Sequence, residues 1–250
     1  MLAQGMCPEG KRIAVVDTEN ESASLYADIV DFDTLNMTNH DPREFIKVIK
    51  AAEADKNIGV LIIDSLSHEW QGTGGYLDIM NDEAKRIKGG NTFVANKVPA
   101  DLHKKLIQVI TASTVHIICT LRSKKKYIDT DENGRRGKKV VGMEPITKEG
   151  TEFEFDVFAE MDLDGNTFII EKTRIFKANG MVIGKPTPEV GKLLVEYLNE
   201  NAEEVLPING NELSVETAPP PIVAQPVQVQ VANDVPAPAV LPVSEAPKVA

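Results

Sequence analysis

The sequence has little cysteine, few aromatic residues and no long apolar run. Its two cysteines, Cys7 and Cys119, are far apart and lack metal-ligand spacing. Their scarcity argues against a disulfide framework and fits a reducing, cytoplasmic setting. No apolar run approaches the ~20 residues that span a bilayer, so no membrane partner is expected. The segment Met1–Cys7 lacks the basic region and apolar core of a signal peptide.

Positive charge is also scarce, with 27 Lys and Arg against 38 Asp and Glu and a net charge of −11. This balance argues against a protein that coats nucleic acid with its whole surface, although it permits one local basic patch. The 250 residues, 42% of them hydrophobic, are enough for one domain of ordinary size.

The C-terminal part of the sequence differs in composition from the rest. Aromatic residues are absent after Tyr197, and nine of the fifteen prolines fall within residues 207–250. Such a segment cannot bury a core, which predicts a disordered, partly polyproline-like tail at 206–250 and a folded domain at 1–205. The tail's composition does not distinguish a linker from a segment that recruits a protein partner.

Strand and helix patterns alternate within the folded part. Apolar runs predict buried strands at 12–17, 59–64 and 115–121, and helical spacing predicts helices at 42–54 and 99–112, each opened by proline. Continuous apolar strands separated by helices indicate a parallel sheet covered on both faces.

The last third predicts antiparallel structure. Residues 152–158 alternate polar and apolar, 164–166 form a turn and 167–170 follow, so we expect a hairpin that finishes the sheet. Thr187 and Pro188 predict the start of a last helix that reaches about residue 201.

Two predicted strands end in acids, Asp17 and Asp64, and ligands collect at the carboxyl ends of strands in open α/β sheets. Asp64, followed by Ser65, has the form of a Walker B acid that meets Mg²⁺ through water, or else it caps the following turn. Glu19 is a candidate for orienting an attacking water. The alternative is that 17–21 is an acidic loop and helix cap.

The segment Gly5–Arg12 nearly matches the phosphate-binding pattern G-x-x-x-x-G-K-[ST]. Arginine occupies the place of the metal-binding hydroxyl, no strand precedes the segment, and a predicted strand rather than a helix follows Lys11. Pro8 and Gly10 therefore predict a plain turn.

A concentration of cations follows the third predicted strand. Thr120 or Arg122 could sense a γ-phosphate there, or form a plain polar strand end. Tyr127 could stack on a base, and the cations could contact a phosphate backbone. Residues 131–134 predict the turn of a flexible excursion, and the alternative is a solvated β-hairpin with ordinary surface charge. The candidate DNA-binding cations are Arg122, Lys124, Lys125, Lys126, Arg135, Arg136, Lys138 and Lys139.

Lys172 and Arg174 share one face of the second strand of the predicted hairpin. They could reach a neighbouring subunit's γ-phosphate, or they are exposed strand charges. Trp70 lies in the glycine-rich segment 68–75, which we predict to be a mobile loop, with His68 a loop residue rather than a catalyst.

Several segments, taken in their order along the chain, resemble phage-type AAA/RecA-like ATPases. Some of these ATPases are single-strand annealing recombination proteins. The resemblance is carried by residues 12–19, 22–27, 61–68, 120–124, 142–145 and 152–156. It implies a RecA-like P-loop NTPase core, α/β with a mostly parallel sheet, helices on both faces and a C-terminal antiparallel hairpin. ATP and Mg²⁺ are the implied cofactors, and the cytoplasm of a phage-infected or prophage-bearing bacterium is the implied location.

The resemblance further implies a protein that acts on single-stranded DNA in recombination or annealing, with a ring or filament of identical subunits as its expected homo-oligomer. Asp64 would be the metal acid and Glu19 would activate water. The expected nucleotide contacts are Asp64, Ser65, Thr120, Lys172 and Arg174.

The sequence departs from the pattern of this family at its N-terminus. Such proteins reach the strand at 12–17 only after a strand, a P-loop and a helix, and Met1–Met6 resembles the end of that helix. We therefore expect the first strand and the P-loop to be absent from this chain, with little or no ATPase activity as a result. Two other hypotheses stay open: a non-catalytic DNA-binding or partner-binding module, and a metabolic α/β enzyme that uses Asp64 and Glu19 differently.

Overall fold

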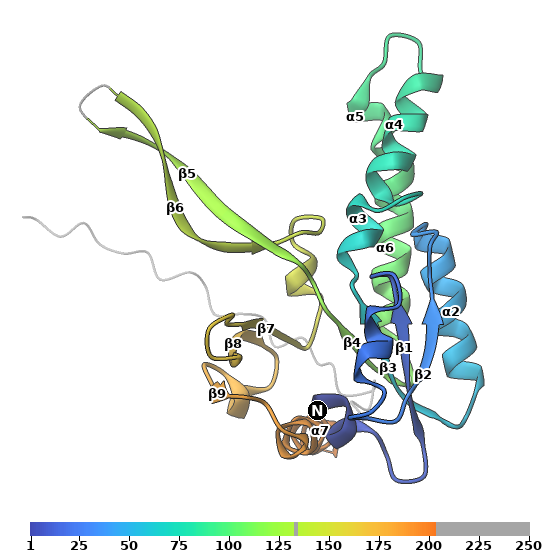
Figure 1. Cartoon of the computed structure of the whole chain (residues 1–250). Helices are drawn as coiled ribbons and strands as arrows, with labels where there is room; N and C mark the ends of the chain where they lie inside the picture. Colours follow the sequence, from blue (N-terminus) through green and yellow to red (C-terminus); the bar gives the residue numbers. More distant parts are fainter. Residues whose placement is uncertain (133–134, 204–250) are drawn as a thin grey trace, which may run out of the picture. The chain divides into compact units, whose positions relative to one another are not determined.

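The computed structural model describes residues 1–132 and 135–203 (Figure 1). Residues Met1–Leu206 form one compact unit, and a second unit, Pro207–Ala250, lies outside the described residues together with the predicted tail. Also outside the description are the side chains of 130–136, 176 and 200–203 and part of the predicted turn at 131–134.

Four parallel strands form the central sheet in the order β2-β1-β3-β4. They are β1 (Arg12–Asp17), β2 (Asp33–Asn36), β3 (Ile58–Asp64) and β4 (His116–Cys119). Because the strands run parallel, their carboxyl ends meet at one edge, and Asp17 is the register partner of Asp64. The predicted parallel sheet is thus confirmed.

Both faces of the sheet are covered, as the uninterrupted apolar strands predict. On one face Leu61 and Ile63, each at most 1% exposed, contact a core that includes residues of α2 (Pro42–Ala54) and α6 (Lys97–Thr111). On the other face Val60 packs in a smaller cluster with Ala3 of α1 (Leu2–Met6). Successive residues of β3 therefore point to opposite cores.

Helix α2 has the predicted bounds. The Asp41 carboxylate accepts the backbone N–H of Arg43 at 2.8 Å, and Pro42 occupies the first helical position, where no donor is needed. Phe45 and Ile49 are buried on the face toward the sheet. Helix α6 begins two residues earlier than predicted, because Pro99 lies within its first turn, where proline is tolerated.

The prediction of a mobile loop at 68–75 is wrong for its first half. Residues Ser67–Gln71 form α3, in which Glu69 is fully buried, and α4 (Tyr76–Arg86) follows. One contact holds this region against α6, and a second holds α3 against α4. His103 Nδ1 lies 3.0 Å from Glu69 Oε2, and the Trp70 and Tyr76 rings are 4.3 Å apart. A short helix α5 (Thr92–Ala95) precedes α6.

Strands β5 (Ser123–Glu132) and β6 (Arg135–Pro145) pair antiparallel with each other in a sheet of their own, hereafter the ribbon. The ribbon extends away from the carboxyl end of β4 (Figure 1). The sequence left two interpretations of this segment open, a DNA-binding loop and a β-hairpin. Its backbone forms a hairpin.

The predicted C-terminal hairpin exists, but it does not finish the parallel sheet. Strands β7 (Val157–Met161), β8 (Thr167–Thr173) and β9 (Val182–Gly184) form a separate antiparallel sheet. The first strand begins at Val157 rather than 152 because Thr151–Phe153 form a 3-10 turn, η2. Another such turn, η3 (Phe176–Ala178), lies between β8 and β9.

The last helix, α7 (Pro188–Glu203), starts where predicted and packs against α1. Two glycines permit the close approach. A Cβ added to Gly5 would lie 1.7 Å from the carbonyl oxygen of Pro188, and one on Gly191 would lie 2.2 Å from that of Leu2. Any larger residue at either position would push the two helices apart.

The third predicted strand is shorter than the expected 115–121 and only half-buried, since β4 is the last strand at its edge of the sheet within the described residues. Burial of the thiol nevertheless raises the pKa of Cys119 to about 12, as expected for a cysteine that acts as a small apolar side chain. None of the described helices has the length and apolar character needed to cross a bilayer.

Replacing Ile49, which is 0% exposed, by alanine should lower the free energy of unfolding by about 2–5 kcal/mol because it leaves a cavity between α2 and the sheet. Chemical denaturation of the 250-residue chain measures this loss. The neighbouring Lys50→Ala, on the exposed face of α2, should stay close to the wild type. Equal losses for both variants would contradict the packing described.

Candidate functional site

Asp17 at the end of β1 organises the loop that carries Glu19. The Asp17 side chain is 1% exposed, and its two oxygens accept the backbone N–H of Glu19 at 2.6 Å and of Ala23 at 2.7 Å. These bonds fix the start of the 3-10 turn η1 (Ser22–Tyr26). Asp17 therefore has the capping role that the sequence left open, and both of its oxygens are occupied by the backbone.

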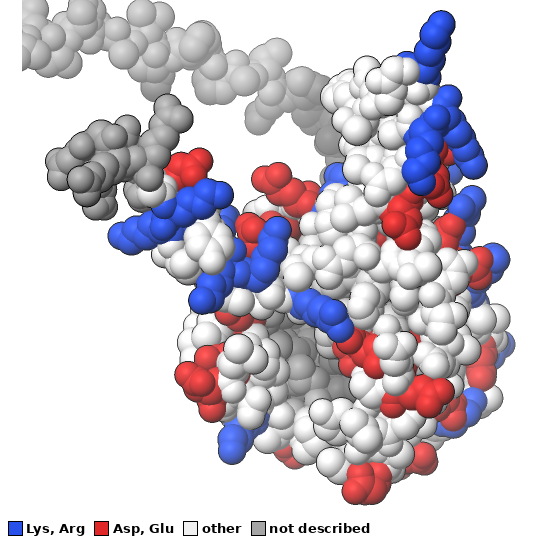
Figure 2. Space-filling view, turned by 45° about the horizontal axis from the view of Figure 1, so that its top comes forward, with Lys and Arg blue, Asp and Glu red and all other residues white. Residues whose placement is uncertain are grey.

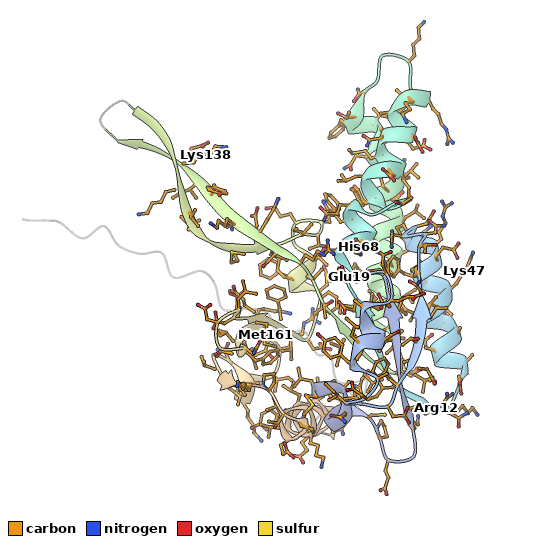
Figure 3. All side chains as sticks on the ribbon, viewed as in Figure 1. Arg12, Glu19, Lys47, His68, Lys138 and Met161 are labelled. Atoms are coloured by element: carbon orange, nitrogen blue, oxygen red, sulfur yellow. The ribbon has the colours of Figure 1, made fainter. Side chains whose placement is uncertain are left out.

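Thr18 ties β1 to the end of β3. Its hydroxyl accepts the backbone N–H of Ser65 at 2.7 Å and donates to the Ser65 carbonyl at 3.0 Å. The Asp64–Ser65 peptide bond is cis. His68 Nδ1 lies 2.7 Å from the same hydroxyl, which brings the histidine beside Glu19 (Figure 3). Residues 18, 65 and 68 thus form one hydrogen-bonded group.

Glu19 is directed at the ends of the other strands. One of its oxygens accepts the Ser65 hydroxyl at 3.1 Å and Arg122 Nε at 2.8 Å, and the other accepts a second N–H of the Arg122 guanidinium. Partial burial raises the pKa of Glu19, but the hydrogen bonds from Arg122 and Ser65 outweigh it, so the net pKa is below the ordinary value. The carboxylate is therefore held ionised by a forked ion pair.

Arg122 also lies directly before the ribbon, at its base. Its backbone N–H donates to the hydroxyl of Ser67, which is fully buried, at 2.9 Å. Its carbonyl accepts the N–H of Ile146, just after β6, at 2.7 Å. The residue assigned from the sequence to DNA binding thus has its guanidinium on Glu19 and its backbone at the base of the ribbon.

Asp64 and Thr120 lie together at the ends of β3 and β4. The Thr120 hydroxyl donates to Asp64 Oδ1 at 2.6 Å, and the Leu66 N–H donates to the Thr120 carbonyl at 2.9 Å. Asp64 is only partly exposed. A carboxylate beside a hydroxyl is a donor set that suits Mg²⁺, with water completing its coordination. Asp64 and Thr120 therefore fit the metal part of a nucleotide site.

No phosphate cradle is found near these residues in the described part of the chain. The near-match Gly5–Arg12 lies at the amino end of β1, at the opposite edge of the sheet from Glu19 (Figure 3). There Lys11 N–H donates to the Pro8 carbonyl at 3.1 Å and Gly10 has φ of 78°, as expected of the predicted turn. A cavity of about 330 Å³ lies at this end, away from the strand ends that carry the acids.

Lys172 and Arg174 bind the backbone of the segment that precedes β7. Lys172 Nζ donates to the carbonyls of Phe153 and Phe155, and Arg174 donates to those of Phe153 and Glu154 and pairs with Asp156 at 3.2 Å. Desolvation and the neighbouring guanidinium lower the pKa of Lys172. Within one subunit both cations hold this segment in place, and their role as trans-acting cations stays a prediction.

The ribbon presents cations and apolar side chains together. The register places Lys125, Tyr127 and Lys138 on one face and Lys124, Lys126 and Lys139 on the other. Tyr127 is 54% exposed, and Lys and Arg side chains gather along the ribbon (Figure 2). Lys124 pairs with Glu144 at 3.3 Å. The side chains of Arg135 and Arg136 lie outside the described residues.

Two site features were missed in the sequence, the contact of His68 with Thr18 and the buried pair of Glu69 with His103. His103 Nε2 also lies 3.1 Å from Thr151 Oγ1, so this histidine links α3, α6 and η2. The helical spacing of His103 with Leu106 and Ile110 could have identified it as a core residue. The residues described include no cluster of three or more His, Cys, Asp or Glu arranged to hold a metal ion.

In a comparison with protein families, the sequence model described as an AAA domain matches residues 1–187. The chain belongs to the AAA domain family. Domains of this family are nucleotide-binding and ATPase-like and typically use ATP and Mg²⁺, in keeping with Asp64 and Thr120 at the strand ends. No curated protein matches the chain, and no solved structure matches it.

Replacing Arg122 by alanine should raise the pKa of Glu19, because the carboxylate loses the ion pair that favours its charged form. A site-resolved NMR titration of the Glu19 carboxyl measures the shift, and Arg122→Lys should give an intermediate value. Since the folded pKa lies below the unfolded one, the stability that Glu19 adds is present above about pH 4.3 and is lost as pH falls through the folded pKa.

Arg43→Ala is the matched control, because Arg43 pairs with Asp41 and does not contact Glu19. It should leave the pKa of Glu19 unchanged. A Glu19 pKa that is the same in the wild type and in Arg122→Ala would contradict the ion pair.

Proposed function

We propose that this AAA domain is the RecA-like core of a phage-type protein that acts on single-stranded DNA in recombination or annealing. In this proposal the ribbon binds DNA, and the residues at the carboxyl ends of β1, β3 and β4 form the nucleotide site. The observation that carries the proposal is the position of Arg122, whose guanidinium binds Glu19 while its backbone lies at the base of the ribbon.

The ribbon suits single-stranded nucleic acid better than a duplex. Tyr127 is exposed between cations on one face of the ribbon, and an aromatic ring can stack on any unpaired base. Lys125, Lys126, Lys138 and Lys139 have no ion pair among the described residues and are available to phosphates. In a chain of net charge −11 the cations are concentrated locally along the ribbon, which favours this surface for the binding of nucleic acid.

The residues at the strand ends have separate chemical roles in the proposal. Asp64 and Thr120 would hold Mg²⁺, which when bound neutralises phosphate charge. Glu19 would orient a water once Arg122 releases it, because a carboxylate that accepts a forked guanidinium has little capacity left for water. DNA bound to the ribbon would then compete with Glu19 for Arg122.

A second candidate function is a DNA-binding module without catalysis. It is favoured by the position of Gly5–Arg12, which places the one near-match to a phosphate loop at the wrong edge of the sheet. In this case Asp64 and Glu19 would only stabilise the fold and the base of the ribbon.

The purified 250-residue chain should show little or no ATP hydrolysis with Mg²⁺, since the described residues at the site lack a phosphate cradle. Its rate should equal that of Asp64→Asn in a phosphate-release assay. Steady Mg²⁺-dependent hydrolysis that Asp64→Asn abolishes would overturn this expectation and exclude the module without catalysis.

Glu19→Gln should bind a fluorescent single-stranded oligonucleotide more tightly than the wild type, because it frees the Arg122 guanidinium for phosphate. One added contact should steepen the slope of log affinity against log salt by about 0.7. Fluorescence anisotropy at several salt concentrations measures both quantities.

The control is Glu21→Gln, which makes the same change in net charge two residues away, where Glu21 is exposed and accepts a bond from Asn36. It should change affinity less and leave the slope unaltered. Lys→Gln changes at 125, 126, 138 and 139 should weaken binding. Binding that is insensitive to salt and to these lysines would refute the ribbon as the DNA surface.

A further inference from the structure

One ring nitrogen of His68 lies within reach of two acceptors. His68 Nδ1 is 2.7 Å from the Thr18 hydroxyl and 3.9 Å from Glu19 Oε1, so a small movement of the ring exchanges one acceptor for the other (Figure 3). Partial burial raises the pKa of Glu19, whereas hydrogen bonds from Arg122 and Ser65 and the charges of Arg122 and His68 lower it, and the lowering wins. His68 therefore already acts on the Glu19 carboxylate.

Thr18 determines which nitrogen of the neutral His68 ring carries the hydrogen. A hydroxyl has a single hydrogen, and that of Thr18 donates to the Ser65 carbonyl at 3.0 Å. The Thr18 oxygen accepts the Ser65 N–H at 2.7 Å, which leaves one lone pair for His68. All three contacts are satisfied only if Nδ1 is a donor. The ring thus presents an N–H to Thr18 and, with a small movement, to Glu19.

A buried neighbour packs against the His68 ring. His40 is 8% exposed, and the centroid of its ring lies 5.0 Å from that of His68. Gly72 permits this arrangement, since a Cβ added there would lie 2.6 Å from His40 Nδ1. Desolvation by burial and the charge of His68 lower the pKa of His40. His40 therefore stays neutral beside a charged His68, and the positive charge of this pair of rings lies on the one next to Glu19.

The partners of Glu19 use its two oxygens differently. Arg122 occupies both, with Nε on Oε1 at 2.8 Å and a second N–H on Oε2. The Ser65 hydroxyl and His68 Nδ1, by contrast, both lie on the side of Oε1, at 3.1 Å and 3.9 Å. A carboxylate held by Ser65 and His68 without Arg122 would therefore keep two donors on Oε1 and leave Oε2 open to a water.

We propose that His68 is a positioning residue for Glu19, which takes over the carboxylate when Arg122 leaves it. In this change of partner, the Nδ1–H moves from the Thr18 hydroxyl to Glu19 Oε1, and Glu19 stays at the strand ends with Oε2 free. The purpose of the change rests on the proposed function, in which Glu19 orients a water after Arg122 has moved to DNA. The contact itself requires neither nucleotide nor DNA.

A double-mutant cycle at Arg122 and His68 tests the change of partner. The pKa of the Glu19 carboxyl is measured by site-resolved NMR titration in the wild type, His68→Gln, Arg122→Ala and the double variant. Imidazole rings are cationic at the pH where carboxylates titrate, so His68→Gln removes a positive charge and should raise the pKa of Glu19. The rise should be larger in the Arg122→Ala background, because only there does the Nδ1–H bind the carboxylate.

A second measurement leaves His68 intact. Nitrogen chemical shifts of its neutral ring should show the hydrogen on Nδ1 both in the wild type and in Arg122→Ala. Hydrogen on Nε2 alone would leave no donor for Glu19 and would overturn the proposal. An effect of His68→Gln that is equal or smaller without Arg122 would overturn it as well, because the ring would then have stayed on Thr18.

His116→Gln is the matched control, because His116 is a half-buried histidine of β4 with no hydrogen bond or ion pair to Glu19 within the described residues. It should leave the pKa of Glu19 unchanged in both backgrounds, and far-ultraviolet circular dichroism checks that every variant folds. The cycle contains no nucleic acid. A ribbon that fails to bind the oligonucleotide would therefore refute the proposed function alone, whereas an additive cycle would refute the role of His68 alone.

Discussion

Parallel pairing of β1, β3 and β4 is the constraint on which the candidate site depends. Parallel strands end at the same edge, so residues from three separate parts of the sequence meet there without any long-range signal of their own. Asp17 then uses both oxygens on backbone N–H groups, which leaves Glu19 to face Ser65 and Arg122. One buried capping carboxylate thereby determines where the carboxylate of Glu19 points.

The sequence predicted the sheet and α2 well because local chemistry determines both. Buried parallel strands must be apolar throughout, and Asp41 with Pro42 marks the first turn of α2. The segment 68–75 could not be predicted in the same way, since its glycines suggest a loop while the buried partner of Glu69 lies more than thirty residues away. Non-local pairs of this kind leave no periodic pattern in the sequence.

The candidate site could be predicted only in part, again because non-local contacts leave no pattern in the sequence. Glu19, Asp64 and Thr120 were identified as candidates by their positions at the ends of predicted strands. Nothing in the sequence indicates that Arg122 turns toward Glu19 rather than along the ribbon. Lys172 and Arg174 have the alternating spacing of exposed strand charges, yet both donate to backbone carbonyls. Those carbonyls lie at the end of the turn η2 and just after it, in a segment that the polar and apolar alternation of 152–158 predicts to be a strand.

The buried pair of Glu69 and His103 has an evolutionary consequence. Glu69 is fully buried, and its second oxygen has no hydrogen-bond partner among the described residues. Losing one member of such a pair leaves the other buried without compensation, at a cost of about 3–5 kcal/mol. A substitution at either position alone would be selected against, whereas a joint change to two apolar residues of similar volume would be tolerated. Positions 69 and 103 should therefore vary together among related chains, and Thr151 should follow His103.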